Sequence, residues 1–123
     1  MRRIPRRTDQ PRGHGGGGTA PEPFALFLAS LATCAGYYVL AFCQARGIPM
    51  EGVSVDMEYE KEATGLLSRV VLRVDLPPTF PEKYVEAVRR AAESCKVKAT
   101  LAHPPAITVR SERHGTSRGT SYA

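Results

Sequence analysis

The longest feature of the hydropathy pattern is a run without a charged residue, PFALFLASLATCAGYYVLAFC, from Pro23 to Cys43. Glu22 and Pro23 at its start and Gly47 after its end are typical of the two ends of a helix. Apolar residues occur all around this helix and do not form a single stripe. We therefore expect a helix that is buried on all sides.

A membrane span is the competing interpretation of this run, because about 20 apolar residues cross a bilayer as a helix. Small residues interrupt the run, and Tyr37 and Tyr38 lie at its centre. A lipid-facing helix favours aliphatic side chains there and keeps tyrosine at the membrane interfaces. We favour a helix inside a protein core and expect no membrane partner.

The next segment alternates between apolar and polar residues from Val53 to Glu60, which predicts a half-buried strand. Thr64 and Gly65 indicate a turn, and a second alternating segment covers residues 67 to 76. The sequence therefore predicts a β-hairpin directly after the long helix.

The remaining pattern predicts a second helix, a short third one and a last strand. Thr79 and Glu82 resemble a capping box, and apolar residues recur from Tyr84 at spacings of three and four, with Cys95 on the buried face. A short helical piece reaches Leu101, and residues 106 to 110 form the last strand. The expected fold class is α+β.

Charge divides the chain into a leader, a domain and a tail. The net charge of +5 is concentrated in residues 1 to 18, which form a basic leader rich in glycine and proline that we expect to be flexible. We expect the domain at residues 19 to 110 and a disordered tail at 111 to 123. A nucleic-acid-binding arm would interleave aromatic residues for base stacking, which the leader lacks, so no nucleic-acid partner is expected.

The three cysteines favour a reducing compartment. They include no C-x-x-C pair, and no histidine cluster accompanies them, which argues against a disulfide framework and against a metal site. The arginines near the N-terminus are not followed by an apolar signal segment. We therefore expect a cytoplasmic protein without a cofactor.

Cys34 and Cys95 are the candidate reactive residues, although a single buried cysteine is more often a small core residue. The assignment to the core is better founded for Cys43 than for the other two cysteines. Cys43 lies about two and a half helical turns from Cys34 and so faces the opposite side of the helix.

Two cysteine segments resemble the OsmC/Ohr family. These segments are GGTAPEPFALFLASLATCAGYYVLAFCQARGIPMEGVSVDMEY, around Cys34, and AAESCKVKATL, around Cys95. The resemblance covers residues 15 to 110, with the hairpin and amphipathic helix between the cysteines as in the family. It implies an OsmC-like fold with a long central buried helix, a small antiparallel sheet and further helices, in an intertwined homodimer.

The resemblance implies a thiol-dependent peroxidase that reduces an organic hydroperoxide. Cys34 would be oxidised to a sulfenic acid, Cys95 would capture it as a disulfide, and an external dithiol would reduce that bond. The apolar approach to Cys34 would be lined by residues at helical spacing, which would serve equally well as dimer core: Phe27, Leu31, Tyr37 and Tyr38.

Two family features are missing from the sequence. The family places a glutamate directly after the proline, where this chain has Phe24, and an arginine from an N-terminal sheet that residues 1 to 18 do not supply. An arginine of the leader could fold over Cys34, and Lys96 or Lys98 could supply charge near Cys95. The alternative hypothesis is a shortened OsmC-like dimer that binds an apolar ligand and is not a peroxidase.

Overall fold

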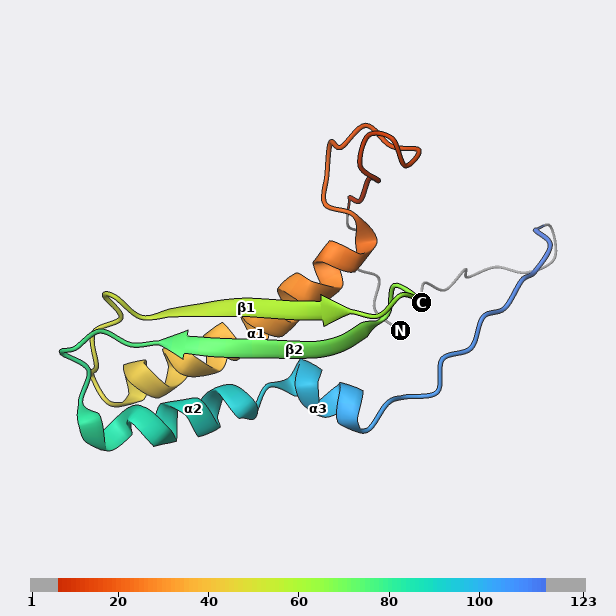
Figure 1. Ribbon diagram of the computed structural model, residues 1–123. Helices are drawn as coiled ribbons and strands as arrows, with labels where there is room; N and C mark the ends of the chain where they lie inside the picture. The colour runs from red at the N-terminus through yellow and green to blue at the C-terminus, as the bar shows by residue number, and fades with distance from the viewer. Residues whose placement is uncertain (1–6, 115–123) are drawn as a thin grey trace.

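The computed structural model describes residues 7–114 and confirms the α+β class. The elements follow in the order α1 (Pro23–Ala45), β1 (Ser54–Lys61), β2 (Leu67–Asp75), η1 (Glu82–Tyr84), α2 (Val85–Glu93) and α3 (Lys96–Ala102) (Figure 1). The two strands form an antiparallel sheet, with Met57 opposite Leu72. The long helix, the hairpin and the two later helices are therefore as the sequence predicts.

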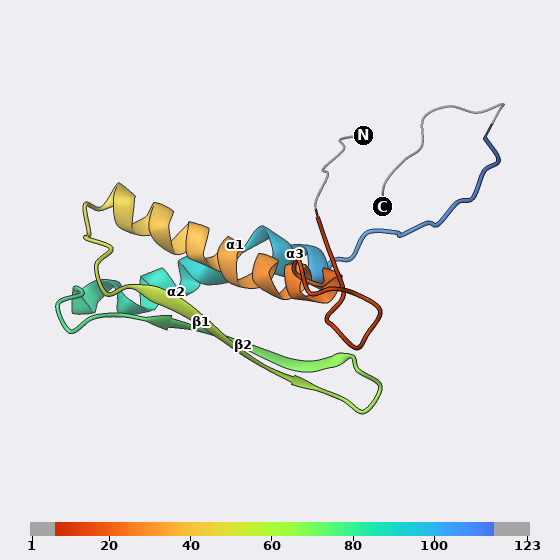
Figure 2. The same ribbon diagram turned by 90° about the horizontal axis from the view of Figure 1, so that it is seen from above.

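The described residues form two layers, one of helices and one of strands. The helices α1 and α2 pack side by side, and the hairpin lies over them. Seen from above, the hairpin moves away from the helices toward its turn (Figure 2). The turn is made by residues 62 to 66, and Gly65 adopts a φ of 88° in it. Thr64 and Gly65 are thus confirmed as the turn.

The core lies between α1 and α2. A single face of α1 is buried, and it packs against Val88 and Ala92 of α2 and against Phe80. The other face is open, since Tyr37 is 63% exposed and Leu40 is also exposed. One amphipathic helix and one hairpin can cover only part of an apolar helix. Burial of α1 on all sides would therefore require a second chain.

The end of α1 has a regular hydrogen-bonded cap. Gly47 has a φ of 65°, a left-handed conformation that glycine adopts without strain. The N–H of Ile48 donates to the Cys43 oxygen at 2.9 Å, and the N–H of Gly47 donates to the Gln44 oxygen at 3.3 Å. This pair of bonds is the Schellman motif, and it confirms Gly47 as the end signal.

Two predicted boundaries are wrong. The capping box at Thr79 is not formed, because Phe80 is buried in the core and the chain enters α2 through the short turn η1, which follows Pro81. Cys95 does not lie on the amphipathic helix either. It follows the end of α2 at Glu93 and immediately precedes α3.

The predicted last strand is also wrong, since residues 106 to 110 have an irregular conformation. Ile107 and Val109 are 79% and 89% exposed. The alternating pattern is present, but a strand also needs a neighbour with which to exchange backbone hydrogen bonds. No strand within residues 7–114 lies beside this segment.

The described part of the predicted leader is a hydrogen-bonded loop. The Asp9 carboxylate accepts hydrogen bonds from the Thr19 hydroxyl at 2.7 Å, the Thr19 N–H at 3.0 Å and the Gly17 N–H at 3.1 Å. These bonds hold the pKa of Asp9 below its ordinary value, and the bond from the Thr19 hydroxyl has the largest effect. The rest of the predicted leader and most of the predicted tail lie outside the described residues, and the flexibility of both segments stays a prediction.

Gly47→Ala should lower the free energy of unfolding by about 1 kcal/mol, because alanine is strained in the left-handed region. No atom lies near the added Cβ, so the effect would come from the backbone alone. Urea denaturation measures it. Gly36→Ala is the matched control, since Gly36 is inside α1 with open space around it, and alanine there should stabilise by roughly 0.5–1 kcal/mol. Equal effects of the two changes would contradict this account.

Candidate functional site

The structure brings Cys34 and Cys95 together. Cys34 lies in the middle of α1, and Cys95 is the residue before α3, which packs against α1. The two thiols lie close enough for each to shift the pKa of the other. Both cysteines are free thiols in the structure. The sequence alone left open whether these residues meet.

The break between α2 and α3 explains this arrangement. The last turn of α2 is closed by the N–H groups of Ser94 and Cys95, which donate to Ala91 and Ala92 at 3.1 and 3.3 Å. Cys95 then adopts an extended conformation, with a ψ of 127°, so that α3 begins as a new helix. As a result the first N–H groups of α3, those of Lys96 and Val97, lie near Cys34 and help to lower the pKa of its thiol.

The surroundings of Cys34 favour its thiolate. Partial burial raises the pKa of the thiol, but hydrogen bonds from the Cys95 thiol and from the N–H groups of Val97 and Lys96 lower it. The positive charge of Lys96 acts in the same direction, and the net result is a pKa below the ordinary value of a cysteine. Lys96, which the sequence placed near Cys95, thus acts on Cys34.

Cys95 has the opposite character. Its side chain is 0% exposed, and burial raises its pKa, as does its hydrogen bond with Cys34. Burial thus favours the protonated form of Cys95. Cys34 is only half-buried. This difference in exposure and pKa distinguishes the two cysteines, which the sequence could not do.

The third cysteine is a core residue, as predicted. Cys43 is fully buried and belongs to the cluster between α1 and α2 that contains Ala35, Val39 and Val88. Burial raises the pKa of its thiol. A buried, protonated thiol is a poor nucleophile.

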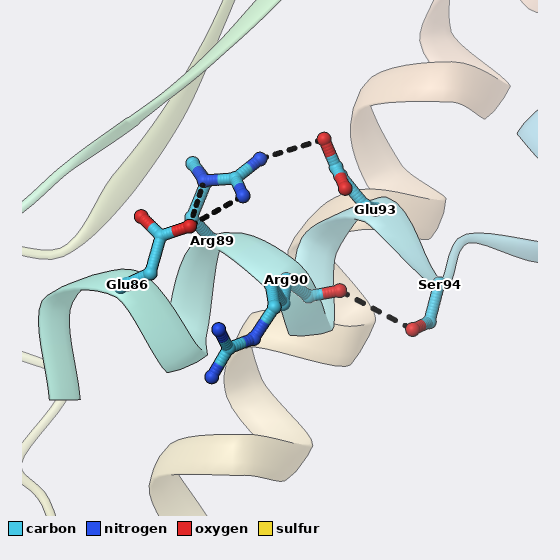
Figure 3. Close-up of polar contacts among 5 residues, drawn as sticks. All are labelled: Glu86, Arg89, Arg90, Glu93 and Ser94. Carbon is cyan, nitrogen blue, oxygen red and sulfur yellow. Dashed lines mark hydrogen bonds and ion pairs between the residues drawn. The ribbon is translucent and has the colours of Figure 1, made fainter.

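Within residues 7–114, the groups that lower the pKa of Cys34 are Cys95, Val97 and Lys96, and no arginine is among them. The Arg12 side chain donates to the Gly17 oxygen within the N-terminal loop. Arg89 is held on the outer face of α2 by Glu86 and Glu93, 3.0 and 2.6 Å away (Figure 3). In the place of the family glutamate, Phe24 packs against Phe27, and the Lys61 ammonium lies 5.0 Å from the Phe24 ring centre.

The predicted approach to Cys34 is not a formed pocket within one chain. Leu31 is part of the buried face of α1, whereas Tyr37 is exposed and packs edge to face against Tyr38, with ring centres 5.3 Å apart. Phe27 contacts Phe24. None of these residues lines either of the two principal cavities of residues 7–114. Their role as a substrate pocket stays a prediction.

One of the two cavities lies between α1 and β1. Its volume is 280 Å³, and its lining includes Ala32, Gly36 and Val39 of α1 with Val53 and Val55 near the start of the hairpin. Helical geometry places these α1 residues on the side away from Cys34. This cavity is therefore separate from the thiol pair, and no pattern in the sequence predicted it.

The described residues bear on what a metal site and a membrane span require. Within residues 7–114, no three His, Cys, Asp or Glu side chains are grouped as a metal site would need. α1 is long and apolar enough to cross a membrane, with a mean hydropathy of 1.8. The core helix of a soluble protein meets the same criterion, so length and hydropathy do not distinguish a membrane span from a core helix.

The alkylation rate of Cys34 should rise with pH through a midpoint below that of glutathione measured in parallel, because its pKa is lowered and the thiolate is the nucleophile. Mass spectrometry of iodoacetamide-treated protein measures this rate for each cysteine. Cys95→Ala should move the midpoint upward, since it removes the thiol hydrogen bond. Cys95→Ser, the matched control, keeps an O–H donor and should retain the low midpoint. A wild-type midpoint at or above that of glutathione would contradict an activated thiolate.

Comparison with solved structures indicates the fold. A protein of Psychrobacter arcticus 273-4, thought to be an osmotic stress induced and detoxification response protein, is similar with a TM-score of 0.63 and 22% identity over 76% of this chain and 69% of that one. An organic hydroperoxide resistance protein OsmC of Legionella pneumophila matches with a TM-score of 0.49 and 23% identity, over 76% and 70% of the two chains. At such identities the likeness concerns the fold.

Among curated proteins, none matches the chain. The family comparison is more specific, because the model of the OsmC-like proteins matches residues 15–110, the same span as the resemblance seen in the sequence. This match covers both cysteine segments and every helix and strand described above. The chain belongs to the OsmC-like protein family.

Proposed function

We propose that this protein is a thiol peroxidase that reduces a hydroperoxide through Cys34 and Cys95. The observation that carries the proposal is the contrast between the two thiols. Cys34 is half-buried with a lowered pKa, and Cys95 is fully buried with a raised one. A peroxide from solution needs an accessible thiolate, and a resolving thiol needs only to lie beside it.

The first step is attack of the Cys34 thiolate on the distal oxygen of the hydroperoxide. The O–O bond breaks, the sulfur gains an oxygen as a sulfenic acid, and the leaving alkoxide takes a proton to become an alcohol. The N–H groups of Lys96 and Val97 hold the negative charge on the sulfur before attack. They take the role that an arginine has in the family.

The second step uses Cys95. Its sulfur displaces the hydroxyl of the Cys34 sulfenic acid, which forms a disulfide and releases water. The two thiols already lie close enough to shift each other's pKa, so little movement is needed. An external dithiol then reduces the disulfide by exchange and is itself oxidised. A reducing compartment such as the cytoplasm would supply it.

An organic hydroperoxide fits the surroundings of Cys34 better than hydrogen peroxide. The neighbours of Cys34 on its side of α1 are apolar or aromatic, among them Leu31 and Tyr38. Such side chains favour an alkyl or aryl group on the substrate. In one chain Leu31 is buried, whereas Cys34 and Tyr38 remain partly open to solvent, so a closed site would need a further surface.

A second copy of the chain is the proposed source of that surface. The open face of α1 includes Tyr37 and Leu40. The small residues Ala29 and Thr33 lie on the same face, nearer the N-terminal end of the helix. Small residues allow another helix to approach closely, and the apolar ones gain free energy when they are covered. We infer a homodimer in which the two α1 helices pack together.

Ligand binding without peroxidase activity is the second candidate function. The apolar cavity of 280 Å³ between α1 and β1 favours it, since a small apolar molecule would fit there without contact to Cys34. The absence of the family glutamate in the sequence favours it as well. The following experiment separates the two functions.

Cys34→Ser should abolish consumption of cumene hydroperoxide, because the nucleophile is lost. In the absence of added dithiol, Cys95→Ser should consume about one equivalent if it stops at the sulfenic acid and about two if it reaches the sulfinic acid, since no resolving thiol remains. Cys43→Ser is the control and should turn over like the wild type. Coupled consumption assays with a dithiol, followed by mass spectrometry, measure all three.

Two outcomes would overturn the peroxidase proposal. One is unchanged turnover in Cys34→Ser. The other is a disulfide between Cys34 and Cys43 in place of Cys34 and Cys95 after mild oxidation. Failure of the wild type to consume peroxide at any pH would favour the ligand-binding function.

Tyr37→Arg should convert the proposed dimer into monomers, because an unpaired charge cannot be buried between two helices without a large cost. Sedimentation velocity at micromolar concentration measures the change. Tyr59→Arg is the control, since Tyr59 is an exposed residue near the turn of the hairpin. A folded wild-type monomer in the absence of detergent would show that no dimer is needed.

A further inference from the structure

The second principal cavity lies where α1 ends and α2 begins. Its volume is 630 Å³, and it is enclosed by the connection after α1, which includes Arg46 and Glu51, and by the segment from Pro77 to Tyr84. Arg46 is twelve residues beyond Cys34, about 18 Å along the helix axis. The thiol chemistry therefore leaves this cavity without a role.

Aromatic side chains hold the Arg46 guanidinium at the edge of this cavity. Its central carbon lies 3.7 Å from the ring centre of Phe42 and 5.6 Å from that of Tyr84, and the two rings pack edge to face. One N–H group donates to the Phe42 oxygen at 3.2 Å. A guanidinium has five N–H donors in a planar array, so donors remain for a ligand.

A second cation borders the same cavity. The Lys83 ammonium lies 5.1 Å from the ring centre of Tyr84, so that two cations lie near this ring. Within residues 7–114, neither Arg46 nor Lys83 takes part in any of the six ion-pair contacts. The lining contains one carboxylate, that of Glu51, so positive charge is in excess.

The rest of the lining is apolar. Phe80 is buried beneath the cavity, and prolines 49, 77 and 81 form much of its wall. Proline and aromatic side chains lose little conformational freedom when a ligand covers them. An elongated or flat apolar group could therefore lie on this wall with its charged end at the two cations.

We propose that this cavity binds a small carboxylate with an apolar body. The planar guanidinium of Arg46 matches a carboxylate with two parallel hydrogen bonds, and Lys83 adds a point charge beside it. The ring of Tyr84 and the prolines contact the apolar body. Glu51 opposes the anion and keeps the affinity modest. This site is independent of the proposed peroxidase activity.

Isothermal titration calorimetry of the full chain with octanoate tests the proposal, with 1-octanol as the uncharged probe. Octanoate should bind saturably at one site per chain, and 1-octanol should bind at least about tenfold more weakly, because it lacks the charge that Arg46 and Lys83 recognise. Equal binding of the two probes, or no saturable binding of octanoate, would overturn the proposal.

Variants locate the site. Arg46→Gln and Lys83→Gln should each weaken octanoate binding by about tenfold or somewhat less, and Glu51→Gln should strengthen it, since a repelling charge is removed. Arg69→Gln on the hairpin and Cys34→Ser are controls and should bind like the wild type. Unchanged octanoate binding in both Lys83→Gln and Glu51→Gln would show that octanoate does not bind in this cavity. This test holds even if Arg46→Gln does not fold.

Discussion

Close packing of α1 against α2 is the constraint on which the site depends. Ala35 and Ala92 meet in this contact, and with Val39 and Val88 they form its buried centre. Small side chains bring the two helix axes near each other, so that the chain leaving α2 passes directly beside the middle of α1. There the backbone becomes extended at Cys95 and starts α3. The cysteine pair is thus a consequence of helix packing.

The electrostatics of the pair follow from that break in the helix. Had α2 continued through Cys95, the N–H groups of Lys96 and Val97 would have bonded to carbonyls of their own helix. The new start leaves them without a carbonyl partner in their own helix, and they help to lower the pKa of Cys34. Burial opposes a thiolate there, and the hydrogen bonds outweigh it. Backbone groups can in this way stabilise a thiolate where the chain has Phe24 in place of a carboxylate.

The sequence was informative about elements and less so about contacts. Periodicity predicted α1, the hairpin and α2, and Gly47 and Gly65 marked their ends, because these signals are local. It placed Cys95 on α2, since VRRAAESCKVKATL keeps a helical pattern across the break. The difference between the thiols was also hidden, because exposure and pKa depend on where α3 packs. The cavity beside Arg46 arises from segments far apart along the chain.

The one predicted strand that is absent shows what an alternating pattern does and does not specify. Alternation in residues 106 to 110 describes side chains that would point to two faces of a sheet, and Ile107 and Val109 would share one face. It carries no information about the neighbouring strand. The hairpin has two strands and lies elsewhere, so the backbone groups of this segment are left to solvent. Its exposed apolar residues and the open face of α1 are both surfaces that gain free energy only when another surface covers them.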